Sequence, residues 1–313
     1  MRYGFGIDLG GTTVKLAFFE ETGTMLHKWE IPTNTADSGK HILPDIAAAI
    51  LSHLETAGVS KTNVMGIGIA VPGPVLPGGT VNKCINLGWG VFNIETTLSA
   101  LTGLPVKAGN DANVAALGEY WQGGGKGYNS MVMVTLGTGV GGGVILDGKI
   151  LTGAHGSAGE IGHMVLNREE TVQCSCGKYG CVEQYCSATG IVRTAKAFLA
   201  ATDAPSVLRA APNFSCKDVF DAADAGDPVA LEFLESFYAR TAEFIANVCS
   251  VLNPEAVVIG GGVSKAGTCL TEGIGRHIGK YVFHAAAGVE LALATLGNDA
   301  GAIGAFKLIL DAA

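Results

Sequence analysis

The chain contains the same short pattern twice, and this repeat limits its possible folds more than any other feature. An apolar run that begins at Phe5 passes through a glycine-rich turn into a second apolar run ending at Phe19. Between Met131 and Leu146 the chain repeats an apolar run, a Gly-Thr-Gly turn and an apolar run. Such runs bounded by glycine turns predict paired β-strands. The repetition indicates an internal duplication and favours two related lobes.

Further strands and helices are predicted after each of these strand pairs. Apolar runs predict additional strands over 28–32, 65–71, 106–108 and 256–259. The spacing of apolar residues and the end signals predict helices over 39–57, 95–102, 112–121, 188–201, 228–252, 265–279 and 301–310. Mixed strands and helices of this kind indicate α/β lobes.

The length of 313 residues allows two domains of ordinary size, each with its own core. We place the hinge near Asp111 and expect the last helix to return to the first lobe. The expected small lobe then comprises residues 1–111 together with about 299–313, and the large lobe comprises 112–298. Two α/β lobes imply a ligand-binding cleft between them.

The charge pattern excludes several classes of partner. The formal net charge is −8, and no cluster of lysines and arginines is present that would neutralise a row of phosphates. This argues against nucleic acid and anionic membranes as partners and favours small ligands. The chain reaches Asp8 without a secretory apolar region, so we expect a cytoplasmic protein. The long uncharged stretch over 127–146 is rich in glycine and predicts strands rather than a membrane span.

Glycine-rich turns follow the ends of three predicted apolar strands. Backbone amides in such turns can approach phosphate oxygens, and Asp8 at the end of the first strand is placed to hold Mg²⁺ through water. A tight hairpin is the alternative for any one of these turns. None has the P-loop pattern or the setting of a dinucleotide fingerprint. The turn residues are Gly10, Gly11, Thr12 and Thr13, then Gly137, Thr138, Gly139 and Gly141, then Gly260, Gly261 and Gly262.

A cysteine cluster lies downstream of the second turn. Cys174, Cys176 and Cys181 occur in a short stretch punctuated by glycines, and His163 precedes them. Three thiolates and an imidazole form a Cys₃His set that a tetrahedral structural zinc accepts. A disulfide is the alternative, although it would leave one thiol of the cluster unpaired. Since four protein ligands close the coordination shell, we expect a structural metal.

Three carboxylates lie beside these features. Asp111 follows a short predicted strand and begins a predicted helix, so by the residues alone a helix N-cap is one reading of it. Glu160 and Glu183 flank the cysteine cluster. For these two, a solvated surface pair stands as the alternative to ligand-binding carboxylates.

Five motifs in this order resemble the ROK family of repressors, open reading frames and sugar kinases. They are Asp8-Leu-Gly-Gly-Thr-Thr, Asn110-Asp-Ala-Asn, Leu136-Gly-Thr-Gly-Val-Gly-Gly-Gly, Glu160-Ile-Gly-His, and the cluster from Cys174 to Cys181. The resemblance covers the chain from end to end. It implies the two-lobed actin-like ATPase fold, which is ribonuclease H-like, with a cleft between the lobes.

The resemblance also implies an activity and a site. A hexose 6-kinase using ATP and Mg²⁺ is expected, with glucose as the leading substrate and structural Zn²⁺ in the Cys₃His set. Asp111 would be the general base that accepts the proton of the sugar hydroxyl. His163 would serve both sugar and zinc. The implied sugar-binding residues are Gly73, Asn86, Asn110, Asp111, Glu160, His163 and Glu183.

Other readings of the same resemblance stay open. Kinases for N-acetylglucosamine, N-acetylmannosamine, fructose or allose share most of the motifs. Repressors of the family carry a winged helix-turn-helix ahead of the first strand, and we expect none here because that strand begins by Tyr3. A non-catalytic sugar-binding module would not need Asp111 beside phosphate turns. The resemblance further implies a homodimer.

Overall fold

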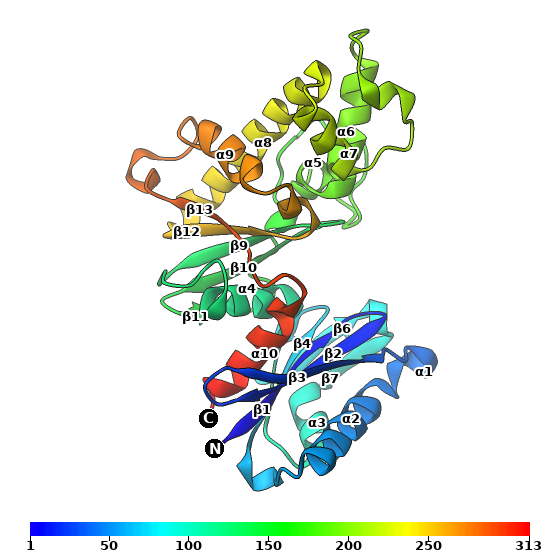
Figure 1. The fold of residues 1–313 in the computed structure, drawn as a ribbon, viewed down its shortest axis with the longest axis vertical. Helices are drawn as coiled ribbons and strands as arrows, with labels where there is room; N and C mark the ends of the chain where they lie inside the picture. The colour runs from blue at the N-terminus through cyan, green and yellow to red at the C-terminus, as the bar shows by residue number, and fades with distance from the viewer. The chain divides into compact units, whose positions relative to one another are not determined.

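The computed structural model describes all residues from Met1 to Ala313. Its contacts divide the chain into two compact units (Figure 1). Unit 1 consists of Met1–Gly127, Gly143–Gly159 and Leu296–Ala313, and unit 2 consists of Tyr128–Gly142 and Glu160–Thr295.

Unit 1 is built on a five-stranded sheet of order β3-β2-β1-β4-β8. The first three strands pair antiparallel, whereas β4 beside β1 and β8 beside β4 run parallel. The mixed α/β class and the predicted order of elements in this part are therefore confirmed. The strands are β1 (Tyr3–Leu9), β2 (Thr13–Glu20), β3 (Met25–Pro32), β4 (Val64–Val71) and β8 (Val106–Asn110).

Large apolar residues alternate with glycine along β1, and this alternation explains how both faces of the sheet are covered. Phe5 and Ile7 are fully buried in the core that also contains Ile46 of α2 (Ile42–Ala57). The intervening glycine, Gly6, leaves room on the other face for α10 (Ala300–Leu310). A Cβ at Gly6 would lie 2.0 Å from the carbonyl oxygen of Ala302. Such close approach of a helix to a sheet requires glycine at this position.

Five helices belong to unit 1, and α4 and α10 pack on each other within it. Gly304 of α10 allows this contact, since a Cβ there would lie 1.8 Å from the carbonyl oxygen of Val114. For this reason unit 1 includes residues 112–127. The division expected from the sequence places these residues in the large lobe instead. The helices are α1 (Ala36–Gly39), α2 (Ile42–Ala57), α3 (Ile94–Thr102), α4 (Asp111–Gln122) and α10 (Ala300–Leu310).

A small three-stranded sheet of order β5-β6-β7 also belongs to unit 1 and was not predicted. Its strands are β5 (Val75–Leu76), β6 (Thr80–Cys84) and β7 (Trp89–Asn93). They are too short and too polar to give a clear alternating signal. A 3₁₀ helix over Ile85–Leu87 joins β6 to β7 and carries Asn86.

The second large sheet repeats the order of the first. Its order is β11-β10-β9-β12-β13, so in both sheets the third, second, first, fourth and fifth strands follow one another. This agreement supports the duplication read from the sequence, and the unit boundary passes through β10. The strands are β9 (Met131–Leu136), β10 (Val140–Leu146), β11 (Lys149–Ile150), β12 (Ala256–Gly260) and β13 (Glu290–Leu293).

The helices of unit 2 include two that were not predicted, α5 and α7. The longest, α8, begins with Pro228 and is capped by the Asp227 carboxylate, which accepts hydrogen bonds from two backbone amides. Although α8 has 25 residues, no helix of the chain combines the length and apolar character needed to cross a membrane. The helices are α5 (Glu183–Cys186), α6 (Ala188–Ala200), α7 (Cys216–Asp224), α8 (Pro228–Leu252) and α9 (Thr268–Ile278).

Candidate active site

The first glycine turn joins β1 to β2 in unit 1. Gly10 N–H donates to the Thr13 carbonyl oxygen at 3.0 Å, and the Thr33 hydroxyl donates to the Gly10 carbonyl oxygen at 2.7 Å. Thr12 is exposed, and a Cβ at Gly11 would meet nothing within 4 Å. The turn is therefore closed by its own backbone and open on its outer side, as phosphate binding requires.

Asp8 has a charged partner that the sequence reading missed. Lys15 lies opposite Asp8 in the antiparallel register, and its Nζ is 3.2 Å from Asp8 Oδ2. Both side chains are about a quarter exposed, at 26% for Lys15 and 22% for Asp8. A hairpin register drawn through the predicted turn would have placed these two residues opposite each other. The turn thus carries one carboxylate and one ammonium group beside its amides.

Asn110 and Asp111 stand where β8 passes into α4. Asn110 caps the helix, because its Oδ1 accepts hydrogen bonds from Ala112 N–H at 3.1 Å and Asn113 N–H at 3.2 Å. The alternative that Asp111 serves only as the N-cap is therefore wrong. Asp111 is the first helical residue, and its Oδ1 accepts from Ala112 N–H at 2.8 Å.

The amide nitrogen of Asn110 is also engaged within the protein. Nδ2 donates to the Gly73 carbonyl oxygen at 3.1 Å and to Asp111 Oδ1 at 3.0 Å. Asn110 therefore orients the Asp111 carboxylate in addition to capping the helix. Gly73 has a φ of +130°, a backbone conformation that favours glycine.

Two further residues lie near this corner of unit 1. Asn86 is exposed on the 3₁₀ helix after β6. Cys84 ends β6 and is buried; burial raises the pKa of its thiol, and the negative charge of Asp111 adds to this shift. Nothing in the sequence around Cys84 indicates that its thiol lies close enough to Asp111 to be affected by the carboxylate's charge.

The second glycine turn joins β9 to β10 and is held by neighbouring elements of unit 2. Ala188 N–H donates to the Gly137 carbonyl oxygen at 2.8 Å, and the Thr189 hydroxyl donates to the Thr138 carbonyl oxygen at 2.8 Å. A Cβ at Gly139 would lie 2.2 Å from Glu183 Oε2. Gly141 lies within β10.

The third glycine run follows β12, which pairs parallel with β9. Gly261 has a φ of +84°, and a Cβ there would lie 2.5 Å from the backbone oxygen of Leu136. The close approach explains why glycine occupies this position. Gly260 ends the strand, and Gly262 opens a 3₁₀ helix with nothing within 4 Å of a Cβ placed on it.

The structure brings the four predicted metal ligands together. Ligand atoms of His163, Cys174, Cys176 and Cys181 all lie within 4.8 Å of one another. The His163 Nδ1 is buried and has no hydrogen-bond partner, as expected of an atom reserved for a cation. The three cysteines are free thiols, which argues against the disulfide alternative. The donor set fits Zn²⁺ in number and chemistry.

Backbone turns shape this cluster. Cys174 N–H donates to the Lys178 carbonyl oxygen at 2.8 Å, and Gly180 has a φ of +74° with room for no side chain. Burial raises the pKa of Cys181 to about 12, and the neighbouring thiols add to the shift. A backbone hydrogen bond at Lys178 instead lowers the pKa of Cys176. A thiolate at Cys181 therefore needs a bound cation.

The two flanking glutamates differ in environment. Glu183 is half-buried; its Oε1 accepts from the Ser175 hydroxyl at 3.0 Å and its Oε2 from Val140 N–H at 3.1 Å. Glu160 is exposed, and its Oε2 lies 4.0 Å from His163 Nε2. The alternative of a solvated surface pair is therefore wrong for Glu183. Ser175, which anchors this carboxylate, was not singled out from the sequence.

Comparisons with known proteins agree over the whole chain. The model of the ROK family matches residues 4–312. The chain is 45% identical to a glucokinase of Halalkalibacterium halodurans, covering 98% of this chain and 95% of that protein. It is 34% identical to a glucokinase of Thermotoga maritima, covering 98% and 96%. A solved structure, a ROK family glucokinase from Streptomyces griseus in complex with glucose and AMPPNP, is similar with a TM-score of 0.73, 33% identity and 98% coverage of both chains.

Proposed function

The chain belongs to the ROK family, and from this premise we propose that it transfers the γ-phosphate of ATP to the 6-hydroxyl of glucose. The products are glucose 6-phosphate and ADP. The similarity to the glucokinase of Halalkalibacterium halodurans across almost the whole chain carries this proposal. The likeness to a glucokinase that binds glucose and AMPPNP supports both substrates.

Asp111 is the proposed general base. It is the first residue of α4, and two hydrogen bonds to its Oδ1, from Ala112 N–H and Asn110 Nδ2, fix its orientation. In this role the carboxylate accepts the proton of the 6-hydroxyl as the oxygen attacks phosphorus. Positioning and charge stabilisation then supply most of the rate enhancement.

The other proposed sugar contacts are one glycine and five polar side chains. They are Gly73, Asn86, Asn110, Glu160, His163 and Glu183. Ionised carboxylates accept strong hydrogen bonds from sugar hydroxyls. Since the polar atoms of Asn110 are already hydrogen-bonded, we assign it a second role, which is to orient Asp111.

The glycine turns are the proposed phosphate-binding elements. The first two turns contain Gly10, Gly11, Thr12 and Thr13, and then Gly137, Thr138, Gly139 and Gly141. Gly10 N–H and Gly137 N–H close the turns on the Thr13 and Gly139 carbonyl oxygens, and other amides of the turns would donate to phosphate oxygens. Gly260, Gly261 and Gly262 would leave room for the nucleotide. Mg²⁺ supplies charge neutralisation on the phosphates when bound. Asp8 is the residue that would hold it through water.

Zn²⁺ is the proposed occupant of the Cys₃His set, with a structural role. His163, Cys174, Cys176 and Cys181 supply four ligands, so the coordination shell has no open position for a reacting water. The cation would fix the shape of the loop between His163 and Glu183. That loop carries two of the proposed sugar contacts.

The setting of the protein is proposed from the family resemblance and the charge pattern. We expect a cytoplasmic homodimer whose ligands are hexose and nucleotide and which binds neither nucleic acid nor membranes. The lobes are proposed as residues 1–111 with about 299–313, and 112–298. Light scattering of the purified protein would measure the oligomeric state.

A coupled ADP-release screen tests the substrate. Purified protein would be assayed with ATP and Mg²⁺ against glucose, N-acetylglucosamine, N-acetylmannosamine, mannose and fructose. The proposal predicts the highest kcat/KM with glucose. A preference for an N-acetyl sugar would replace the assignment with one of the related kinase activities. Absence of ADP release with every sugar would favour a binding module.

A further inference from the structure

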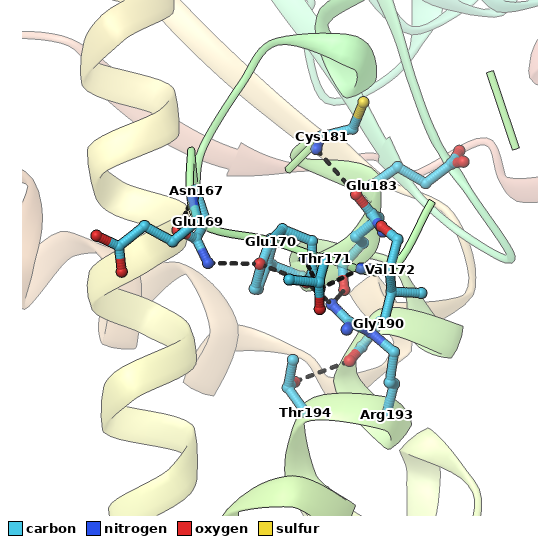
Figure 2. Close-up of polar contacts among 12 residues, drawn as sticks. Asn167, Glu169, Glu170, Thr171, Val172, Cys181, Glu183, Gly190, Arg193 and Thr194 are labelled. Carbon is cyan, nitrogen blue, oxygen red and sulfur yellow. Dashed lines mark hydrogen bonds and ion pairs between the residues drawn. The ribbon is translucent and has the colours of Figure 1, made fainter. Parts of the chain in front are cut away.

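A second set of contacts, separate from the thiols, holds the segment that carries the cysteines. Its centre is Glu170, whose side chain is only 9% exposed. Glu170 Oε2 accepts from the Tyr185 hydroxyl at 2.6 Å. It also accepts from Arg193 Nη2 at 2.7 Å, and Figure 2 shows Glu170 and Arg193. Its Oε1 accepts from the backbone N–H groups of Thr171 and Val172, both at 3.0 Å. We call these contacts the Glu170 network.

The network continues to the helix that begins with Glu183. Arg193 Nη2 also donates to the Gln184 carbonyl oxygen at 3.0 Å, and its guanidinium lies 5.3 Å from the centre of the Tyr185 ring. The Gln184 side chain donates to the Val172 carbonyl oxygen at 2.8 Å and accepts from Cys181 N–H at 3.1 Å. The two residues after Glu183 and the backbone of one cysteine are therefore held by the network.

One carboxylate and one guanidinium pair directly in the network, and a second guanidinium, that of Arg240, lies 5.2 Å from the centre of the Tyr185 ring. The Glu170 carboxylate faces one guanidinium, and the guanidinium is oriented by an aromatic face and a carbonyl oxygen. Burial by itself raises the pKa of Glu170, but hydrogen bonds from Arg193, Tyr185 and Val172 N–H outweigh it and lower the pKa to about 2. Glu170 is therefore ionised at neutral pH. Charge-assisted hydrogen bonds of this kind are stronger than neutral ones.

The network uses none of the metal-ligating atoms, and it contacts a ligand residue only at the backbone N–H of Cys181. None of the side-chain atoms in its hydrogen bonds belongs to His163, Cys174, Cys176 or Cys181. Arg193 and Glu183 line the same groove, which has a volume of about 240 Å³. Ser175, which stands between Cys174 and Cys176 in the sequence, also lines this groove. A displaced Arg193 would therefore change the groove on which Glu183 opens.

We propose that the Glu170 network is a metal-independent brace that positions Glu183 for sugar binding. Glu170, Tyr185 and Arg193 are positioning residues, since they act through Gln184 and the helix start and not by touching the sugar. The inference rests on the proposed function in one respect, the contact between Glu183 and the sugar. The zinc site and the brace then hold the same segment from two sides, and loss of either leaves the other.

Glu170→Gln tests the brace, with Glu235→Gln as the matched control. Glu235 also pairs with an arginine of unit 2, Arg276, but both side chains are about half exposed. We expect Glu170→Gln to raise the glucose KM at least fivefold while kcat stays within twofold of wild type. The control variant, Glu235→Gln, should keep both the glucose KM and kcat within twofold of wild type. Tyr185→Phe, which removes one hydroxyl, should raise KM in the same direction by a smaller factor.

Hydrogen exchange gives a readout that does not depend on activity. After removal of the metal with a strong chelator, amides over 170–184 in wild type should keep much of their protection, whereas in Glu170→Gln they should exchange at least tenfold faster. Equal protection in the two chelated proteins, or a glucose KM of Glu170→Gln within twofold of the control, would overturn the brace. Failure of wild type to phosphorylate glucose would overturn the proposed function alone, because the exchange comparison would still decide the brace.

Discussion

The two glycine turns after β1 and β9 come from the same repeated pattern, yet they are held differently. The first closes on its own backbone and has Asp8 and Lys15 beside it. The second has no ion pair of its own and is fixed by Ala188, Thr189 and Glu183. The two turns share one strand–turn–strand pattern, and only the second is fixed by the start of α6 and by Glu183, which follows the cysteine cluster.

The contrast suggests different roles for the carboxylates of the two units. Unit 1 contains Asp8 and Asp111, which are proposed to hold Mg²⁺ and to accept the proton of the reacting hydroxyl. Unit 2 contains Glu183 and the metal ligands, proposed to bind sugar and to hold the binding segment. Changes in the unit 1 carboxylates should therefore lower kcat, whereas changes in unit 2 should raise KM or lower stability.

The largest effect is expected for Asp111→Asn. The amide keeps an oxygen that can accept from Ala112 N–H but loses the basic carboxylate, so kcat should fall by about 10³-fold or more. Glucose affinity measured by calorimetry should stay within threefold. Activity within tenfold of wild type would remove Asp111 from the catalytic role.

The second-largest fall in kcat is expected for Asp8→Asn. Losing the carboxylate beside the first turn should lower kcat on the order of 10²-fold and raise the Mg²⁺ concentration needed for half-maximal rate. Asp299→Asn is the control, because Asp299 of unit 1 pairs with Lys28 in a partly exposed ion pair. A Mg²⁺ dependence of Asp8→Asn that matches the control would contradict the assignment.

Glu170→Gln should lower stability in a pH-dependent way. The pKa of Glu170 is lowered from 4.5 to about 2, so its contribution is present above pH 4.5 and is lost as pH falls toward 2. At pH 7 the loss in unfolding free energy should be about 1–3 kcal/mol. Denaturant titrations at pH 7 and pH 3 should show the gap between wild type and variant shrinking. A gap that is constant or wider at pH 3 would contradict this reading.

Glu183→Gln should have the smallest effect on kcat and act mainly on glucose binding. The amide oxygen still accepts from Val140 N–H, while the charge available to sugar hydroxyls is lost. Glucose KM should rise about tenfold with kcat changed far less. Steady-state kinetics measure both constants. A fall in kcat at unchanged KM would contradict a role of Glu183 in sugar binding and would indicate a role in catalysis.

Structural elements that repeat along the chain or contain a recognisable motif could be predicted from the sequence. The strand–turn–strand pairs, the long helices and the Cys₃His set follow from local patterns, and the structure has them. The Glu170 network was not predictable in this way. Glu170, Tyr185 and Arg193 are separated along the chain and lie in no shared motif, so only the folded segment brings them together.

Register and packing account for the other differences. Lys15 meets Asp8 only through the hairpin register, and the choice of Asn110 over Asp111 as the cap depends on where the helix begins. Helix ends are poorly defined by sequence alone. The strands of the small sheet were missed because they are short and polar, although they carry the residues around Asn86.

Identification of the reaction product distinguishes 6-phosphorylation of glucose from every other reaction. Purified protein would be incubated with ATP, Mg²⁺ and glucose, and the product analysed by phosphorus and proton NMR. We expect one phosphate monoester on the 6-oxygen of glucose, formed in equal amount to ADP and absent with Asp111→Asn. A phosphate on another oxygen, or ATP hydrolysis with no sugar phosphate, would contradict it.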